Sequence, residues 1–150
     1  MNRSFVYTFF ITLIIIILVL WGYDALLGKQ RIDDGVDEDI STLKVKIDNK
    51  DYILNLEKNE TTKYFIKMLP KTFKMSDLNY NEKYIYLDET LPKNEKKVRS
   101  IIAGDVMLFG DNCLVIFYKS FDTVYSYTKI GHINNIEELK SDDVTVIITK

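Results

Sequence analysis

VMLF-GDN-CLVIFY, residues Val106–Tyr118, is the stretch that decides the fold. Two apolar runs flank a Gly-Asp-Asn turn, a pattern typical of a β-hairpin. Near-continuous apolar runs indicate strands that are covered on both faces. The hairpin is therefore predicted to lie in the middle of a sheet. Cys113, at the start of its second strand, is expected to be a buried thiol without reactivity.

On both sides of this hairpin, apolar and polar residues alternate with period two, which indicates further strands. These patterns cover residues 43–47, 52–56, 72–78, 83–87, 124–133 and 144–149. The main helical pattern is Tyr64–Leu69, with Asn59 or Thr61 as its N-cap and Pro70 as its end. Ile136–Leu139 is expected to form a helical turn. About eight strands with one longer and one shorter helix predict a mainly-β domain, either a small closed barrel or a sandwich.

Phe5–Trp21 (FVYTFFITLIIIILVLW) is an apolar run that only two threonines interrupt. As a helix rising ~1.5 Å per residue, Phe5–Tyr23 would be about 28 Å long, enough to cross the hydrocarbon core of a bilayer. The alternative is a cleaved secretory signal, but the run is too long for one and no small-residue cleavage site follows it. We predict a short tail at residues 1–4 and a single transmembrane anchor at 5–23.

The N-terminal tail with Arg3 is similar to that of a signal anchor, which predicts a single-pass protein of the cell membrane with an extracellular C-terminal domain. Residues 24–41 are mainly acidic and lack an apolar period, so they are predicted to form an extended tether. A calcium-binding loop is the alternative there, but the full EF-hand pattern is missing. Residues 42–150 have the usual size of one domain.

Composition bears on the partners and cofactors. The chain has 20 Lys and Arg against 22 Asp and Glu and no basic stripe, so a nucleic-acid partner is not expected. With one cysteine and one histidine, neither a metal centre nor a cofactor is predicted. Asp77, Asp105 and Asp111 are expected to accept backbone hydrogen bonds in turns. Gly-rich phosphate loops and Gly-x-Ser-x-Gly motifs do not occur.

Several motifs resemble, in order, those of the bacterial cyclophilin-like domain family. They are MSDLN (75–79), NEKY (81–84), AGDVML (103–108), GDNCLVIFY (110–118) and YSYTKIG (125–131). The resemblance extends from about Leu43 to Ile148. It implies a compact, closed antiparallel β-barrel of about eight strands, capped by one or two short helices. The anchor and the tether lie outside the part of the chain that it covers.

The resemblance does not imply isomerase activity. True cyclophilins isomerise X-Pro bonds with an arginine that lies in an apolar groove, and this chain lacks their Phe-Met-x-Gln motif. Arg99, the only arginine of the domain, is placed at the end of a predicted loop. The counterpart region Met75–Leu87 offers lysine and Glu82, and a lysine does not replace a planar guanidinium. No catalytic residue is therefore assigned.

Aromatic residues carry the strongest remaining indication of a site. Ligand pockets are typically apolar and aromatic with a few polar groups. The alternative is that the rings only fill and cover the barrel, with their hydroxyls in water. The candidate ligand-binding residues are Met75, Asn79, Glu82, Tyr84, Tyr86, Phe109, Tyr118, Tyr125 and Tyr127.

The sequence leaves three functions open. The first is a membrane-anchored, non-catalytic module that binds a peptide, a protein or a small ligand. The second is an enzyme, either a divergent peptidyl-prolyl isomerase or a hydrolase that uses Asp77 and Glu82 of the Met75–Leu87 region. The third is a structural part of a cell-envelope assembly. A buried carboxyl group with a raised pKa in the groove would favour the enzyme, and an open tyrosine-lined groove without a charged centre would favour the binding module.

Overall fold

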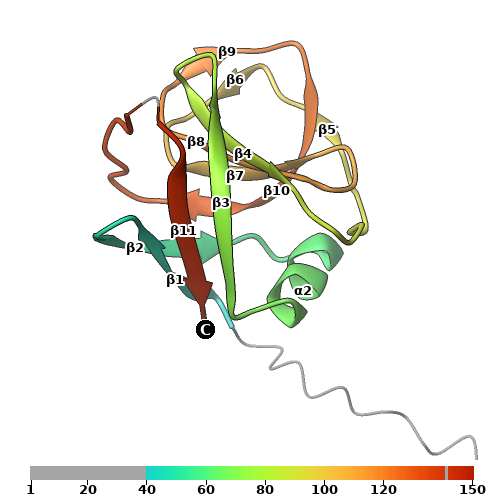
Figure 1. Ribbon diagram of the computed structural model, residues 1–150. Helices are drawn as coiled ribbons and strands as arrows, with labels where there is room; N and C mark the ends of the chain where they lie inside the picture. The colour runs from blue at the N-terminus through green and yellow to red at the C-terminus, as the bar shows by residue number, and fades with distance from the viewer. Residues whose placement is uncertain (1–39, 141) are drawn as a thin grey trace, which may run out of the picture. The chain divides into compact units, whose positions relative to one another are not determined.

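The computed structural model describes residues 40–140 and 142–150 (Figure 1). The predicted tail, the anchor at 5–23 and nearly all of the predicted tether lie outside the described residues. Within the described part of the chain, no helix is both long enough and apolar enough to cross a bilayer.

One helix and eleven strands make up the described chain. In order they are β1 (Thr42–Ile47), β2 (Lys50–Leu56), α2 (Glu60–Lys67), β3 (Lys71–Leu78), β4 (Glu82–Tyr86), β5 (Lys96–Lys97), β6 (Ser100–Ile101), β7 (Asp105–Phe109), β8 (Cys113–Phe117), β9 (Phe121–Asp122), β10 (Ser126–Ile133) and β11 (Val144–Thr149). Eight of the strands form an antiparallel barrel in the order β2-β1-β11-β3-β4-β8-β7-β10, which closes where β10 pairs with β2. The predicted closed barrel is confirmed.

The hairpin predicted from Val106–Tyr118 is formed by β7 and β8, with Phe109 opposite Cys113. Gly110 has φ +64°, a conformation that glycine adopts without steric cost, and it begins the turn. All five residues of β8 are buried. Leu114 and Ile116 face the barrel interior, whereas the alternate residues of β8 belong to a second cluster on the outer face. The strand is thus covered on both faces, as the apolar run predicted.

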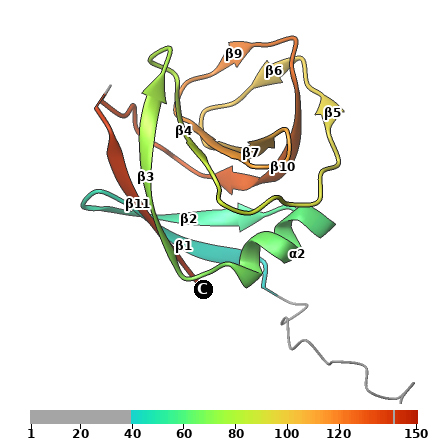
Figure 2. The same cartoon turned by 45° about the vertical axis from the view of Figure 1, so that its right-hand side comes forward.

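The barrel interior is filled by aliphatic residues from its strands together with Phe65 and Leu69 of the helical segment. Figure 2 shows α2 at one end of the barrel, beside β1 and β2. Asn59 caps the helix, as predicted, because its Oδ1 accepts a hydrogen bond of 2.9 Å from the backbone N–H of Thr62. The helix is therefore held by its cap and by the burial of one face.

A second layer covers the outer face of β8. Ile101 of β6, Phe121 of β9 and Tyr127 of β10 pack there against Cys113 and Phe117. The short strands β6 and β9 pair with each other, and β5 pairs with the start of β10 (Figure 2). This layer matters for function because it forms one wall of the pocket described below.

Two local predictions were wrong. Ile136–Leu139 forms no helical turn, and the backbone carbonyls of Lys140 and Asp142 just after it accept hydrogen bonds from the Lys83 ammonium group. The strand predicted at 124–133 begins only at Ser126, since the Thr123 hydroxyl accepts the N–H of Tyr125 and turns the chain there. The described chain therefore has one helix and not two.

Candidate functional site

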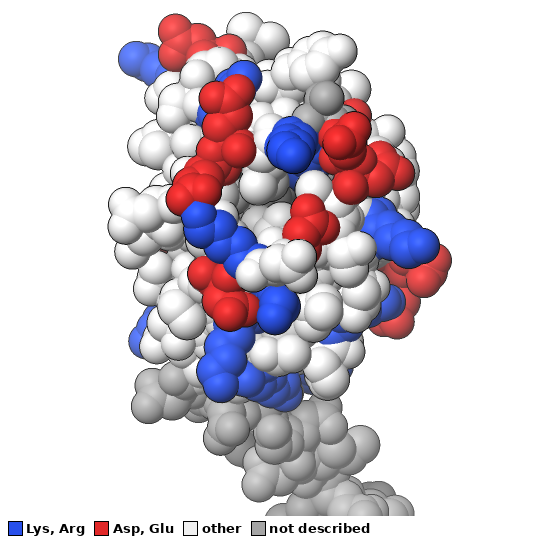
Figure 3. All heavy atoms as spheres, turned by 60° about the vertical axis from the view of Figure 1, so that its left-hand side comes forward, with Lys and Arg blue, Asp and Glu red and all other residues white. Residues whose placement is uncertain are grey.

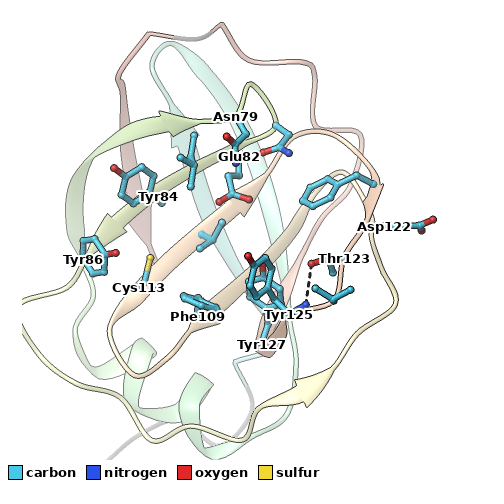
Figure 4. A pocket seen from close by; sticks show the side chains of 15 residues that line it. Asn79, Glu82, Tyr84, Tyr86, Phe109, Cys113, Asp122, Thr123, Tyr125 and Tyr127 are labelled. Atoms are coloured by element: carbon cyan, nitrogen blue, oxygen red, sulfur yellow. Dashed lines mark hydrogen bonds between the residues drawn. The ribbon is translucent and has the colours of Figure 1, made fainter.

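A pocket of about 710 Å³ opens on the outer face of the barrel (Figure 4). Its walls come from the β3–β4 turn, β4, the β7–β8 hairpin and the segment from β9 to β10. The lining residues are Leu78, Asn79, Asn81, Glu82, Tyr84, Tyr86, Phe109, Cys113, Val115, Phe121, Asp122, Thr123, Val124, Tyr125 and Tyr127. Seven of the nine candidate residues lie among them: Asn79, Glu82, Tyr84, Tyr86, Phe109, Tyr125 and Tyr127.

Strand geometry explains why β4 supplies three of these side chains. Successive residues of a strand point to opposite faces, so Glu82, Tyr84 and Tyr86 share one face. Lys83 points to the other face and is fully buried. Because β4 pairs with β8, Cys113 and Val115 lie beside the two tyrosines and form the pocket floor.

Aromatic rings form two groups around the pocket. Tyr84 and Tyr86 contact each other edge to face, with ring centroids 6.0 Å apart. Phe109 lies 5.9 Å from Tyr125 and 5.5 Å from Tyr127. Tyr127 is buried, whereas Phe109, Tyr125 and Tyr86 are 44%, 59% and 65% exposed. The pocket therefore has a buried aromatic base and an exposed aromatic rim.

The carboxyl group of Glu82 points into the pocket between these two groups of rings (Figure 4). Burial, and to a smaller extent the nearby negative charge of Asp77, raise its pKa to about 7. No ion pair joins Glu82 to any other described residue. At neutral pH, the pocket therefore presents a carboxyl group that is about half protonated.

Asp77 lies behind the pocket in a different environment. Its carboxylate accepts hydrogen bonds from Lys83 Nζ at 2.7 Å, from the Tyr118 hydroxyl at 2.6 Å and from the N–H of Tyr80 at 3.1 Å. Burial alone would raise the pKa of Asp77, but the bonds from Lys83 and Tyr118 outweigh it and hold this pKa below its usual value. Asp77 is thus a paired anion, and its hydrogen bond to the turn is the one predicted.

Two of the nine candidates do not line the pocket. Met75 is fully buried on the inner face of β3, in the barrel core. Tyr118 is also buried, and burial together with its hydrogen bond to Asp77 raises the pKa of its hydroxyl. Met75 was a candidate because it begins the Met75–Leu87 region that the resemblance places at the groove, but it shares the buried face of β3 with Phe73. Tyr118 was a candidate as one of the aromatic residues between the two tyrosine pairs, and it directly follows β8, where the alternation of the strand does not fix its side.

The sequence analysis missed several lining residues, of which Asn81 is the most informative. Its Oδ1 atom is buried and has no hydrogen-bond partner among the described residues. Its position directly before Glu82 was the available signal. Phe121 to Val124 were missed because this irregular segment has no periodic pattern. Cys113 was expected to be buried and unreactive, and burial does raise the pKa of its thiol, which keeps it protonated.

Other polar clusters lie outside this pocket. Asp105 accepts the N–H of Ile102, as expected of a turn residue, and its carboxylate also contacts His132 at 3.0 Å and Lys129 at 3.1 Å. Asp111 has an exposed side chain. Within the described chain, no three His, Cys, Asp or Glu side chains are arranged to hold a metal ion. These aspartates therefore add no second candidate site.

A further hollow of about 800 Å³ lies over β1, β2 and the end of β11. Its walls include the long side chains of Lys44, Lys46 and Lys50, and Tyr52 is its aromatic residue. Flexible, solvated lysines give a ligand little fixed geometry, so this hollow is the weaker candidate.

The protein is therefore a closed, eight-stranded antiparallel β-barrel with an aromatic pocket of ligand size on its outer face. The chain belongs to the cyclophilin-like family, whose model matches residues 45–149. This match confirms the resemblance of the sequence motifs. No curated protein and no solved structure matches the chain.

Proposed function

We propose that this protein is a membrane-anchored binding module whose pocket takes a peptide segment, part of a protein or a small ligand. The pocket itself is the supporting observation. Its volume of about 710 Å³ falls in the range of small-molecule sites, about 300–1,000 Å³. Its rim leaves Phe109, Tyr86 and Tyr125 exposed. A ligand that covers these rings would gain the free energy of removing apolar surface from water.

The membrane part of the proposal rests on the apolar pattern of Phe5–Tyr23 and on the acidic stretch that follows it. In this arrangement the anchor and tether hold the pocket domain near the outer surface of the cell membrane. A tag at the C-terminus would then be digested by protease added to intact cells. Protection of the tag until the cells are lysed would contradict the proposed orientation.

The described surface of the protein carries no strong charge of one sign. This supports a partner that is recognised by the pocket and not by long-range electrostatic attraction. On the face shown in Figure 3, basic and acidic side chains are mixed. The whole chain has a formal net charge of −2 at pH 7. Nucleic-acid-binding surfaces are instead continuous and basic. We therefore propose no nucleic-acid partner.

An enzyme is the second candidate, and Glu82 is the observation that favours it. A carboxyl group with a pKa of about 7 is suited to proton transfer at neutral pH. Neither Arg99 nor Asp77 lines the pocket, however, and Asp77 is held by Lys83. A divergent isomerase or hydrolase would therefore depend on Glu82 as its ionisable group, which is why the binding module is preferred.

Binding and catalysis can be tested on the same sample of the full chain. Two-dimensional NMR with proline-containing peptides is expected to give shifts confined to the pocket lining, without faster cis–trans exchange of the peptide. Phe109→Ala should weaken binding about tenfold by removing rim surface. The matched control is Tyr64→Ala, because Tyr64 on α2 is as exposed as Phe109 and lies outside the pocket. Exchange catalysis that is lost in Glu82→Gln would establish the enzyme instead.

A further inference from the structure

The charges around the pocket all have one sign. Glu82 and Asp122 are the acidic residues among the fifteen that line it, and none of these described residues is Lys, Arg or His. Glu82 lies inside the pocket, whereas Asp122 is exposed at its edge (Figure 4). The ionised pocket therefore attracts cations and repels anions.

Hydrogen-bond acceptors in the pocket lack donors. The Asn81 Oδ1 atom is buried without a partner, and Glu82, the next residue, has no ion pair within the described chain. Buried acceptors are normally satisfied, and an unsatisfied one is costly. Asp77 differs from Glu82 in this respect. Lys83, which follows Glu82 on β4 and points to the opposite face, forms an ion pair with Asp77 of β3. The fold thus supplies a cation to Asp77, and none of the described ion pairs involves Glu82.

The aromatic rings add a second attraction for positive charge. Tyr84 and Tyr86 stand on one side of Glu82, and Phe109, Tyr125 and Tyr127 stand on the other (Figure 4). The face of an aromatic ring attracts an ammonium group by about 0.5–2 kcal/mol, more when water is excluded. A neutral ligand would use the rings and leave the carboxyl group without a partner. An anionic ligand would be repelled by Glu82.

From these observations we infer that the pocket selects ligands with a cationic amine on an apolar body, with the ammonium group bound by Glu82 and the apolar part by the rings. This inference rests on the proposed binding function of the pocket and names the chemistry of its ligand. A lysine side chain of a peptide and a free alkylamine share this chemistry.

Such binding depends on pH through Glu82. The other ionisable groups around it are Asp77 from β3, Asp122 at the edge, and the hydroxyls of Tyr84, Tyr86 and Tyr125. Tyr118, Cys113 and Tyr127 also lie near it, and their pKa values are raised, so they stay neutral. Without ligand, the Glu82 pKa is about 7. A bound ammonium group stabilises the carboxylate, so binding below pH 7 releases a proton. Affinity for an amine should therefore rise as the pH increases from 6 to 8.

Calorimetric titration of the full chain in phosphatidylcholine nanodiscs tests this, with empty nanodiscs as the blank. The probes are phenethylamine, its neutral counterpart 2-phenylethanol and the anion 3-phenylpropionate. At pH 8 the amine is expected to bind about tenfold more tightly than the alcohol. At pH 6.5, titrations in buffers of different ionisation enthalpy should show proton release. A lysine peptide and its acetylated form then separate the peptide source from the free amine.

Variants assign the effect to its residue. Glu82→Gln should remove the preference for the amine and the proton release, and should still bind 2-phenylethanol, which also shows that the pocket is folded. Glu95→Gln, the same change at an exposed glutamate outside the pocket, is the control and should keep both effects. Equal affinity for amine and alcohol, or tighter binding of the anion, would overturn the inference and leave the proposed binding function standing. Binding of none of the three probes would overturn both.

Discussion

Two carboxyl groups on neighbouring strands illustrate how environment decides the role of a residue. Asp77 on β3 is paired with Lys83, and its pKa is lowered. Glu82 on β4 lies in the pocket without a cation, and its pKa is raised by burial and by the charge of Asp77. The first carboxylate stabilises the fold, and the second is available to a ligand.

Replacing Glu82 should change how stability depends on pH. In the unfolded chain its pKa is near 4.5, and in the fold it is about 7, so ionisation favours the unfolded state. The free energy of unfolding therefore falls as pH rises from about 4.5 through 7. Glu82→Gln should lose this decrease and be more stable than wild type at pH 8 by about 1–2 kcal/mol, after allowance for water in the open pocket. Urea unfolding of both proteins at pH 4.5 and 8 measures this difference in stability. The same change in the free energy of unfolding with pH in both proteins would contradict the prediction.

Removing the Lys83 ammonium group should strongly destabilise the barrel. Lys83→Met removes the cation paired with the Asp77 carboxylate and the side-chain donor to two backbone carbonyls, which should cost about 3–5 kcal/mol in urea unfolding. Lys74→Met, at an exposed position of β3, is the matched control. Adding Asp77→Asn to Lys83→Met should restore part of the loss. A loss below about 1 kcal/mol in Lys83→Met would contradict the account of this network.

At the scale of elements, periodicity predicted the strands that have one buried face, and the apolar run of Val106–Tyr118 predicted the central hairpin. The prediction of a helical turn at Ile136–Leu139 failed, because the short apolar spacing there does not distinguish a turn of helix from irregular chain. Periodicity also could not find the bulge in β10 between Lys129 and Gly131, because register depends on the partner strand.

Closure of the barrel depends on Gly131, where β10 meets β2. A Cβ atom at this position would lie 2.3 Å from the Asn55 carbonyl oxygen, too close for any side chain. Gly131→Ala should therefore separate the two strands and cost about 3 kcal/mol or more. Gly110→Ala is the control, because it meets no atom and should cost only about 1 kcal/mol for its positive φ. Equal losses in urea unfolding would contradict this account of closure.

For the whole molecule, the closed barrel was predictable because its motifs resemble those of the cyclophilin-like family. The pocket was predictable only in part. Tyr84 and Tyr86 share a strand face, and alternation places them together. Phe121 to Val124 enter the pocket through irregular chain, whose path is set by packing against the outer cluster. No sequence pattern pointed to Asn81, because the feature that distinguishes it, a buried acceptor without a hydrogen-bond partner, depends on the three-dimensional structure.

The anchor should behave as a unit separate from the barrel. The strands of the barrel all lie within residues 42–149. We expect the full chain to stay in the membrane fraction after carbonate washing, and a variant lacking residues 1–23 to be released. Both should give the same NMR shifts with phenethylamine. A full chain that washes off the membrane would contradict the predicted anchor.

The central claim is that the aromatic pocket with Glu82 is the ligand site of this protein. An NMR titration of the full chain with phenethylamine, followed by residue-specific shifts, tests it most directly. The account predicts saturable shifts at Glu82, Tyr84 and Tyr127, and none at the hollow lined by Lys44 and Lys46. Shifts confined to that lysine-lined hollow, or the absence of saturable shifts in the pocket, would contradict it.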